Sequence, residues 1–431
     1  MKTPKFIVLA VVFAGFLAYS NSLSGPFVFD DLNSISENRT IRHLWPPWNA
    51  FSPSHGTGST VEGRPILNFT FAVNYALGGT MPRGYHAVNL VIHILAGLTL
   101  FGIARRTLLQ PVVAKWFETE ATPLALAIAV IWMVHPLATA AVTYVVQRAE
   151  SLMGLFYLLT MYCAIRGAES EKKGPWYALS VTACLLGMAT KEVMVSAPLM
   201  VLLYDRTFIT GSFSQAWKQR RQLYVGLAST WAVLGYLVMT TGSHGGTASF
   251  GSGFTWWQYA LIQCRAIVHY LKLSVWPYPL VFDYGILPVS YVGGVLPYVL
   301  ALAALVTGIV LALSRRPAIG FLGVWFFAIL APSSSVVPLP TETIAEHRMY
   351  LPLVAVVALA VLGIYRLIGR RSLLVFLALA VGLGLMSRRR NEDYHSDLAL
   401  WGDTVQKCLG NVRARVNLGA IFFRMGRVQE A

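Results

Sequence analysis

Eleven mostly apolar stretches dominate this chain of 431 residues, and most are long enough to cross a bilayer core roughly 30 Å thick. Because lipid offers the backbone no hydrogen-bond partners, such stretches fold as helices. Residues are 56% hydrophobic and only 12% charged, more apolar than a soluble core requires. The sequence therefore predicts an all-α polytopic membrane protein with spans near 6–23, 86–104, 122–142, 149–166, 175–190, 193–204, 223–241, 293–313, 318–338, 350–368 and 372–387.

A twelfth apolar segment, residues 259–276, carries Arg265, His269 and Lys272 at helical spacing along one stripe. That pattern is typical of a helix lying in the membrane interface. If it lies flat, the loops on the side of the N-terminus hold 17 Lys and Arg residues, and the opposite loops hold nine. Since positive charge collects on the cytoplasmic side, this distribution favours eleven spans with the C-terminus outside.

Two adjacent carboxylates, Asp30 and Asp31, follow the first span in the run Gly25-Pro-Phe-Val-Phe-Asp-Asp. Acids near lipid are costly, so a pair at the mouth of a helix bundle is a functional-site hypothesis. A carboxylate beside another one, near a low-dielectric wall, has a raised pKa and becomes a better base. Spacing alone leaves a turn or a helix N-cap equally open.

Further polar residues fall on the same outer face in the predicted topology. Glu346, His347 and Arg348 offer an acid, a titratable ring and a hydrogen-bond donor for phosphate in consecutive positions. Snorkelling to the membrane interface would explain Arg348 but neither of the other two. Lys191 and Glu192 are held near the bundle by two close apolar runs, where they pair with each other or contact substrate. His135 caps a helix or binds a ligand. Arg148 and Glu150 open the next span.

Several classes of site are disfavoured by what the sequence contains. The net charge of +15 falls mostly in short loops, so no nucleic-acid partner is expected. The four cysteines give neither a disulfide framework nor metal-ligand spacing, and there is no Walker loop or dinucleotide fingerprint. We expect no tightly bound cofactor and no metal held by protein ligands. A divalent ion bridging Asp30 or Asp31 to a phosphate stays open.

The order of several blocks resembles the transmembrane and tetratricopeptide-repeat O-mannosyltransferases and their bacterial relatives, within the GT-C glycosyltransferase superfamily. The blocks include Phe27-Val-Phe-Asp-Asp31, the run from Gly63 to Tyr75, the run from Pro82 to His93, Gln147-Arg-Ala-Glu150, Thr190-Lys-Glu192, Phe282-Asp-Tyr284 and Glu346-His-Arg-Met-Tyr-Leu-Pro352. They extend over nearly the whole chain.

The resemblance implies a GT-C-like helix bundle that transfers a mannose-like sugar from a polyprenyl-phosphate carrier, with inversion, to a protein Ser or Thr hydroxyl. It implies that Asp30 or Asp31 is the general base. Arg348, and next Lys191 or Arg64, would hold the lipid phosphate. The supporting residues would be Glu192, His347, Glu346, His135, Arg148 and Glu150.

The implied partners are membrane lipid, the lipid-linked sugar and a protein acceptor. Transfer to a lipid or an envelope polysaccharide is the alternative within the enzyme class. A transporter or a catalytically inactive scaffold is the alternative outside it. We expect a bacterial inner membrane with the site facing the periplasm, or else an endoplasmic-reticulum membrane with a lumenal site.

Two regions are expected along the chain. Residues 1–390 form the transmembrane domain, with long outer loops at about 24–85 and 242–292, and residues 391–431 form an external helical tail. Residues 414–431 look like the opening helix of a tetratricopeptide repeat. A lone repeat helix cannot bury its apolar face, so we expect either a longer array or docking of Ile421 and Phe422 on this or another chain.

Overall fold

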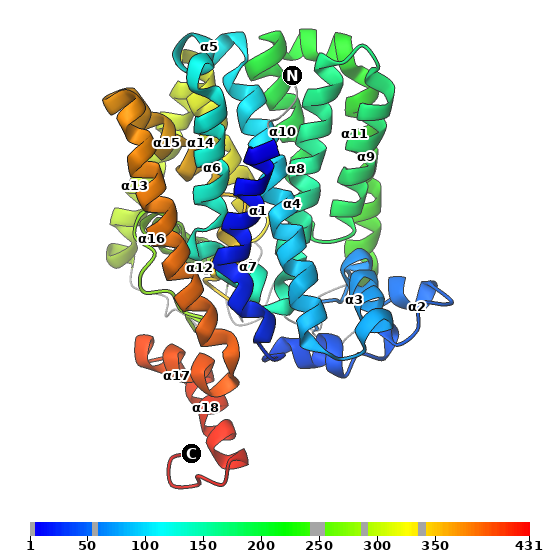
Figure 1. The fold of residues 1–431 in the computed structure, drawn as a ribbon, viewed down its shortest axis with the longest axis vertical. Helices are drawn as coiled ribbons and strands as arrows, with labels where there is room; N and C mark the ends of the chain where they lie inside the picture. Colours follow the sequence, from blue (N-terminus) through cyan, green and yellow to red (C-terminus); the bar gives the residue numbers. More distant parts are fainter. Residues whose placement is uncertain (1–4, 54–58, 242–254, 286–291, 335–341) are drawn as a thin grey trace.

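The computed structural model describes residues 5–53, 59–241, 255–285, 292–334 and 342–431. Within these ranges the regular structure is helical throughout, without a β-strand (Figure 1). This confirms the predicted all-α class. The α-helices are α1 (Lys5–Tyr19), α2 (Trp48–Phe51), α3 (Pro65–Gly78), α4 (Pro82–Leu108), α5 (Pro111–Phe117), α6 (Ala121–Met133), α7 (Thr139–Thr143), α8 (Arg148–Glu169), α9 (Lys173–Met188), α10 (Ala197–Tyr204), α11 (Phe213–Thr241), α12 (Trp256–Val275), α13 (Val292–Arg315), α14 (Pro317–Leu330), α15 (Leu353–Ile368), α16 (Ser372–Glu392), α17 (Asp397–Lys407) and α18 (Val412–Arg424).

The chain is a multi-pass membrane protein. In the part that the structure describes, seven helices are long and apolar enough to cross a membrane, or eight if the bent pair 111–133 and 136–143 forms one span. Each of the eleven predicted segments falls on helix, although the end of 318–338 lies outside the described residues. The count of eleven spans stays a prediction.

The difference between the two counts comes from particular helices. α9 and α14 have 16 and 14 residues, which is short for a span. α15 and α16 count as one stretch of 43 residues, Leu353–His395. They nevertheless run antiparallel, since the start of α15 and the end of α16 both lie near the end of α6. Trp132 Nε1 donates to the Tyr350 carbonyl just before α15, and Ser387 Oγ, near the end of α16, donates to the Val134 carbonyl.

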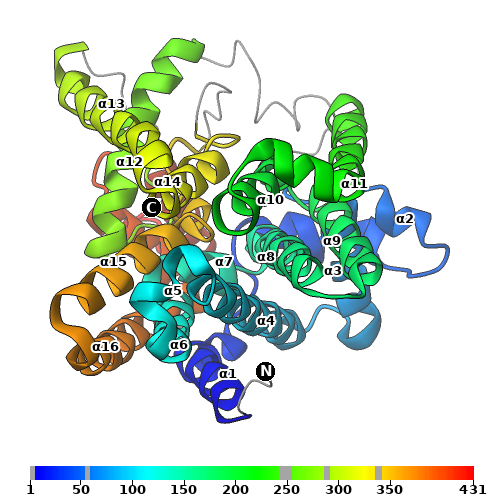
Figure 2. The same cartoon turned by 90° about the horizontal axis from the view of Figure 1, so that it is seen from above.

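α12 is the segment predicted to lie in the interface. Its first turn carries a capping box between Thr255 and Gln258, and one face is buried through Tyr259, Ala266 and Tyr270. Figure 2, which looks down on the molecule, shows α12 lengthwise along one side of the bundle, next to α13. Of the predicted polar stripe, Arg265 and Lys272 are exposed on the opposite face, whereas His269 is half-buried with its ring 5.3 Å from that of Tyr284.

One end of the bundle gathers the connecting segments. Figure 1 shows α2, α3, α17 and α18 at this end, opposite α5. The predicted outer loop 24–85 folds here into short helical turns, α2 and α3, and the start of α4. Of the second predicted loop, residues 242–254 and 286–291 lie outside the described residues.

Candidate functional site

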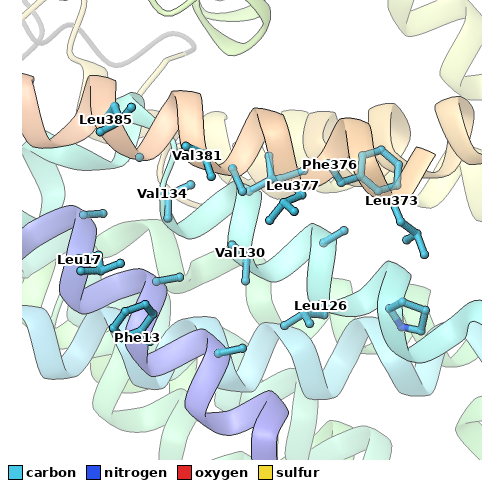
Figure 3. A pocket seen from close by; sticks show the side chains of 18 of the residues that line it. Phe13, Leu17, Leu126, Val130, Val134, Leu373, Phe376, Leu377, Val381 and Leu385 are labelled. Carbon is cyan, nitrogen blue, oxygen red and sulfur yellow. The ribbon is translucent and has the colours of Figure 1, made fainter. Parts of the chain in front are cut away.

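A groove of about 580 Å³ runs along the side of the bundle between α1, α6 and α16 (Figure 3). Phe13, Val130 and Leu377 are typical of its lining, and Arg388 is the one charged residue among its lining residues. An apolar surface of this kind is what a bundle presents to lipid. Transfer chemistry needs convergent polar groups, which the lining of this groove does not supply.

The two adjacent aspartates have different surroundings. Asp31 is fully buried, and both of its carboxylate oxygens accept backbone hydrogen bonds, from Val28 N at 3.0 Å and Val146 N at 2.7 Å. Burial raises the pKa of Asp31 to about 8, against the effect of these N–H donors. Because both oxygens are engaged, Asp31 ties the loop that follows α1 to the segment before α8, and neither oxygen is left for a substrate.

Asp30 points elsewhere because the chain turns at Phe29. Phe29 has a φ of 46°, which an L residue with a side chain adopts only when its surroundings enforce it. Its ring is packed edge-to-face on Phe282 at 5.9 Å and on Trp401 at 5.1 Å. The next residue, Asp30, donates its backbone N–H to the Tyr144 hydroxyl at 3.0 Å and lines a small polar pocket.

This pocket, which we call the Asp30 pocket, is built from six segments that are separate in sequence. Its lining includes Asp30, Tyr144, Phe282, Asp283, Glu342, Glu346, His347, Tyr394 and Arg413. Burial raises the pKa of Asp30 to about 6, helped by the negative charge of Glu342. The Tyr144 hydrogen bond and the Arg413 charge act in the opposite direction. A carboxylate that titrates near neutral pH in a polar pocket suits general base catalysis.

A cluster of positive charge adjoins the same pocket at His347. Burial lowers the pKa of His347 well below its usual value, and the charges of Lys191, Arg348 and Arg64 lower it further. The charges of the three basic residues singled out from the sequence therefore all lower the pKa of His347, although the residues come from different segments. A concentration of cations beside a candidate base is a suitable surface for a phosphate group.

Arg348 is the most deeply buried arginine of this cluster. It is 4% exposed, and its Nη2 donates to the Glu342 carbonyl at 2.6 Å. Its Nη1 is buried without a hydrogen-bond partner in the described part of the chain. A buried guanidinium N–H without an acceptor costs free energy unless a ligand completes it.

The structure corrects one expectation about the other two cations. Lys191 and Glu192 do not pair with each other. Lys191 Nζ contacts Glu150 Oε2 at 2.5 Å, and Arg64 Nη2 contacts Glu192 Oε2 at 3.3 Å. Adjacent residues in an extended backbone point to opposite sides, and Lys191 is extended, so each finds a partner on another segment.

Arg148 joins three helices through its hydrogen bonds. It is fully buried, Nε donates to Asn89 Oδ1 at 2.6 Å, Nη1 to Asn74 Oδ1 at 2.7 Å and Nη2 to the Tyr85 carbonyl at 3.0 Å. Its guanidinium also lies 4.6 Å from the centre of the Phe71 ring. These contacts join α3, α4 and α8, and they leave Arg148 committed to the protein itself.

His135 and Glu346 are committed in the same way. His135 Nδ1 accepts from Leu137 N at 3.2 Å, so of the two roles predicted for it the cap is the one observed. Glu346 accepts from the Val281 backbone N–H, and from the Tyr284 hydroxyl at 2.9 Å. Glu346 thereby fixes the loop that carries Phe282 and Asp283 into the Asp30 pocket.

Sequence reasoning missed several contributors to the pocket, Tyr394 among them. Tyr144 lies between two apolar segments, Glu342 precedes the Glu346 block, and Arg413 belongs to the predicted tail. None carries a motif, and only their contacts identify them. Among the described residues no group of three or more His, Cys, Asp and Glu side chains is arranged to hold a metal ion.

No protein-family model matches the sequence. A protein O-mannosyl-transferase of Caenorhabditis elegans is 24% identical, and the match covers 98% of this chain and 61% of that protein. The human protein O-mannosyl-transferase TMTC4 is 25% identical across 96% of this chain and 64% of its own length. The Drosophila melanogaster protein O-mannosyl-transferase Tmtc2 is 33% identical across 52% of this chain and 23% of its own.

Among solved structures, ArnT from Cupriavidus metallidurans bound to undecaprenyl phosphate has a TM-score of 0.49 and 15% identity, covering 99% of this chain and 73% of that one. A likeness of this size assigns no function. The chain spans less than two thirds of the length of the curated relatives named above. Along nearly its whole length the chain is similar in sequence to the protein O-mannosyl-transferases named above.

Proposed function

We propose that this chain is an integral-membrane glycosyltransferase. It moves a mannose-like sugar from a polyprenyl-phosphate carrier to a serine or threonine hydroxyl of a protein, at the outer face of the membrane. The observation that carries the proposal is the Asp30 pocket, in which a carboxylate with a pKa near 6 adjoins a cluster of three cations. The names of the relatives supply the sugar and the protein acceptor.

In the proposed reaction Asp30 takes the proton of the acceptor hydroxyl. The hydroxyl oxygen forms a bond to the anomeric carbon of the sugar while the bond from that carbon to the phosphate oxygen breaks. The polyprenyl phosphate leaves with both electrons of that bond, and attack from the opposite face inverts the anomeric centre. The cations stabilise the negative charge of the leaving phosphate, with Arg348 first because its Nη1 has no acceptor among the described residues.

Asp31 does not share the role of base in this proposal. Both of its oxygens already accept backbone N–H groups. Asp30 lines the pocket, where the Tyr144 hydroxyl accepts from its backbone N–H and also lowers the pKa of its carboxyl by hydrogen bonding. The proposal thus chooses between the two candidates that the sequence left open.

The test uses the full chain in lipid nanodiscs with polyprenyl-phosphate mannose, labelled in the sugar, and a Ser/Thr-rich peptide. We expect labelled peptide from the wild type, and a loss of about 10²- to 10⁴-fold in kcat for Asp30→Asn. Glu37→Gln is the matched control, because Glu37 is an exposed acid of the same loop.

Two outcomes would contradict the proposal. Full turnover in folded Asp30→Asn would remove the proposed base. Label appearing only in lipid or polysaccharide added to the assay, and never in peptide, would replace the protein acceptor by the alternative acceptor.

A further inference from the structure

The C-terminal hairpin, formed by α17 and α18, packs directly on the residues that shape the Asp30 pocket. Trp401 of α17 is 2% exposed. Its ring lies edge-to-face against Phe29 at 5.1 Å and against Phe282 at 5.3 Å. Since Phe29 immediately precedes Asp30, the hairpin is fixed beside the proposed base by aromatic packing from two loops.

Polar contacts give this packing a defined register. Lys407 Nζ donates to the Leu280 carbonyl at 3.0 Å, and Asn411 Nδ2 donates to the Asp283 carbonyl at 2.8 Å. The other amide atom of Asn411 caps α18, accepting from Ala414 N at 3.0 Å. Gly285 passes so close that an added Cβ would lie 3.0 Å from the Asn411 side chain. The start of α18 is therefore locked onto the loop at 280–285.

One residue of the hairpin enters the pocket itself. Arg413, in the first turn of α18, contacts Asp283 Oδ2 through Nη1 at 3.1 Å. Its side chain is about one-third exposed, at 31%, and it lines the Asp30 pocket. The ion pair with Asp283 holds the guanidinium at the pocket wall, where its charge faces the proposed base.

We propose that Arg413 is a positioning residue for the transfer reaction, through which the C-terminal hairpin sets the charge balance around Asp30. The proposal rests on the proposed function and deepens it, because it makes the tail part of the transfer site. A tail that served only to bind acceptor protein would not need a cation in this pocket.

The charges around Asp30 fix the direction of the effect. The other ionisable groups that line the pocket are Tyr144, Asp283, Glu342, Glu346, His347 and Tyr394. Glu342 and Asp283 raise the pKa of Asp30, whereas Arg413 lowers it. Removing the Arg413 charge must therefore raise that pKa, and the base then loses its proton only at higher pH.

The experiment is the pH profile of kcat for peptide mannosylation by the full chain in nanodiscs, with Arg413→Gln compared with wild type. We expect the acidic limb to move up by roughly one pH unit, the low end for a nearby charge. That shift corresponds to a kcat about tenfold lower at pH values well below the wild-type limb, and to little loss of kcat at pH 8. Arg413→Lys, which keeps the charge, should restore most of the profile.

Two further variants separate charge from docking. Arg415→Gln is the matched control, since Arg415 is an exposed arginine on the same helix. Lys407→Met removes an anchor of the hairpin outside the pocket. Both should leave the acidic limb in place, even if Lys407→Met lowers the melting temperature.

The outcomes distinguish this inference from the proposed function. An unmoved limb in active Arg413→Gln, or an equal shift in Lys407→Met, would overturn the role of Arg413 while leaving the transferase intact. Absence of transfer by the wild type would instead overturn the proposed function. If Arg413→Gln does not fold, a limb in Arg413→Lys that differs from wild type by a full unit would count against the inference.

Discussion

Two buried regions lie side by side at the loop end of the bundle, and each holds an arginine and one of the adjacent aspartates. In the framework region, Arg148 donates to Asn89, Asn74 and Tyr85, and Asp31 accepts from two backbone N–H groups. In the Asp30 pocket and its cation cluster, Arg348 Nη1 has no acceptor among the described residues, and the Asp30 carboxyl faces the pocket.

The two regions differ in how completely their buried polar groups are hydrogen-bonded within the protein. A buried polar group whose partners are all in the protein contributes to stability, because removing it leaves those partners unsatisfied. A buried polar group with an open position costs stability and is compensated only when a ligand binds. The type of residue therefore does not distinguish the framework region from the Asp30 pocket. The hydrogen-bond partners of each buried group do.

The largest effect expected from this contrast is on folding, from Arg148→Met. The substitution keeps much of the volume but strands three buried acceptors, each worth about 1–3 kcal/mol. We expect a destabilisation of roughly 3 kcal/mol or more, seen as a large fall in melting temperature and in monodisperse protein in detergent. An unchanged melting temperature would show that the framework region is not saturated in the way described.

The same substitution at the other arginine should act on ligand affinity. Arg348→Met removes charge-assisted hydrogen bonds to phosphate worth about 1.5–3 kcal/mol, so KM for the lipid-linked sugar should rise about 10- to 100-fold. The melting temperature should fall less than in Arg148→Met, because Arg348 hydrogen-bonds the Glu342 carbonyl and Tyr259 but has one N–H without an acceptor among the described residues. If Arg348→Met melts as early as Arg148→Met, the distinction between the two regions fails.

A smaller effect is expected from Asp31→Asn. The amide can accept one of the two backbone N–H groups, from Val28 or Val146, but its NH₂ then faces the other. We expect a loss of about 1–3 kcal/mol in unfolding free energy, with kcat of the folded fraction retained. A stable but inactive Asp31→Asn would reverse the assignment of the two aspartates.

The smallest effect concerns pH in the wild type. Asp30 acts as the carboxylate, and burial raises its pKa to about 6, so protonation removes the base as pH falls through that value. The rate should decline about tenfold per pH unit below pH 6. Asp31→Asn should show the same acidic limb, and a limb near pH 4 would indicate a base in an exposed environment instead.

Much of the fold could be predicted because its cause is local. A long apolar run near lipid must satisfy its own backbone hydrogen bonds, so 86–104 and 223–241 had to be helical whatever they pack against. The position of the polar residues at segment ends likewise indicated that Asp30, Lys191 and Arg348 share one face. Span number was harder, because α9 and α14 are too short for length alone to decide.

The sequence by itself determined the helical membrane class, the apolar segments and the set of polar residues from which a site could be drawn. Tertiary structure alone decided which members of that set are used. Lys191 meets Glu150 from 41 positions away, Phe29 turns Asp30 but not Asp31 into the pocket, and Arg413 arrives from the tail. The physical reason is that helix formation follows from local hydrophobicity, whereas hydrogen-bond saturation depends on distances between segments that the sequence does not place.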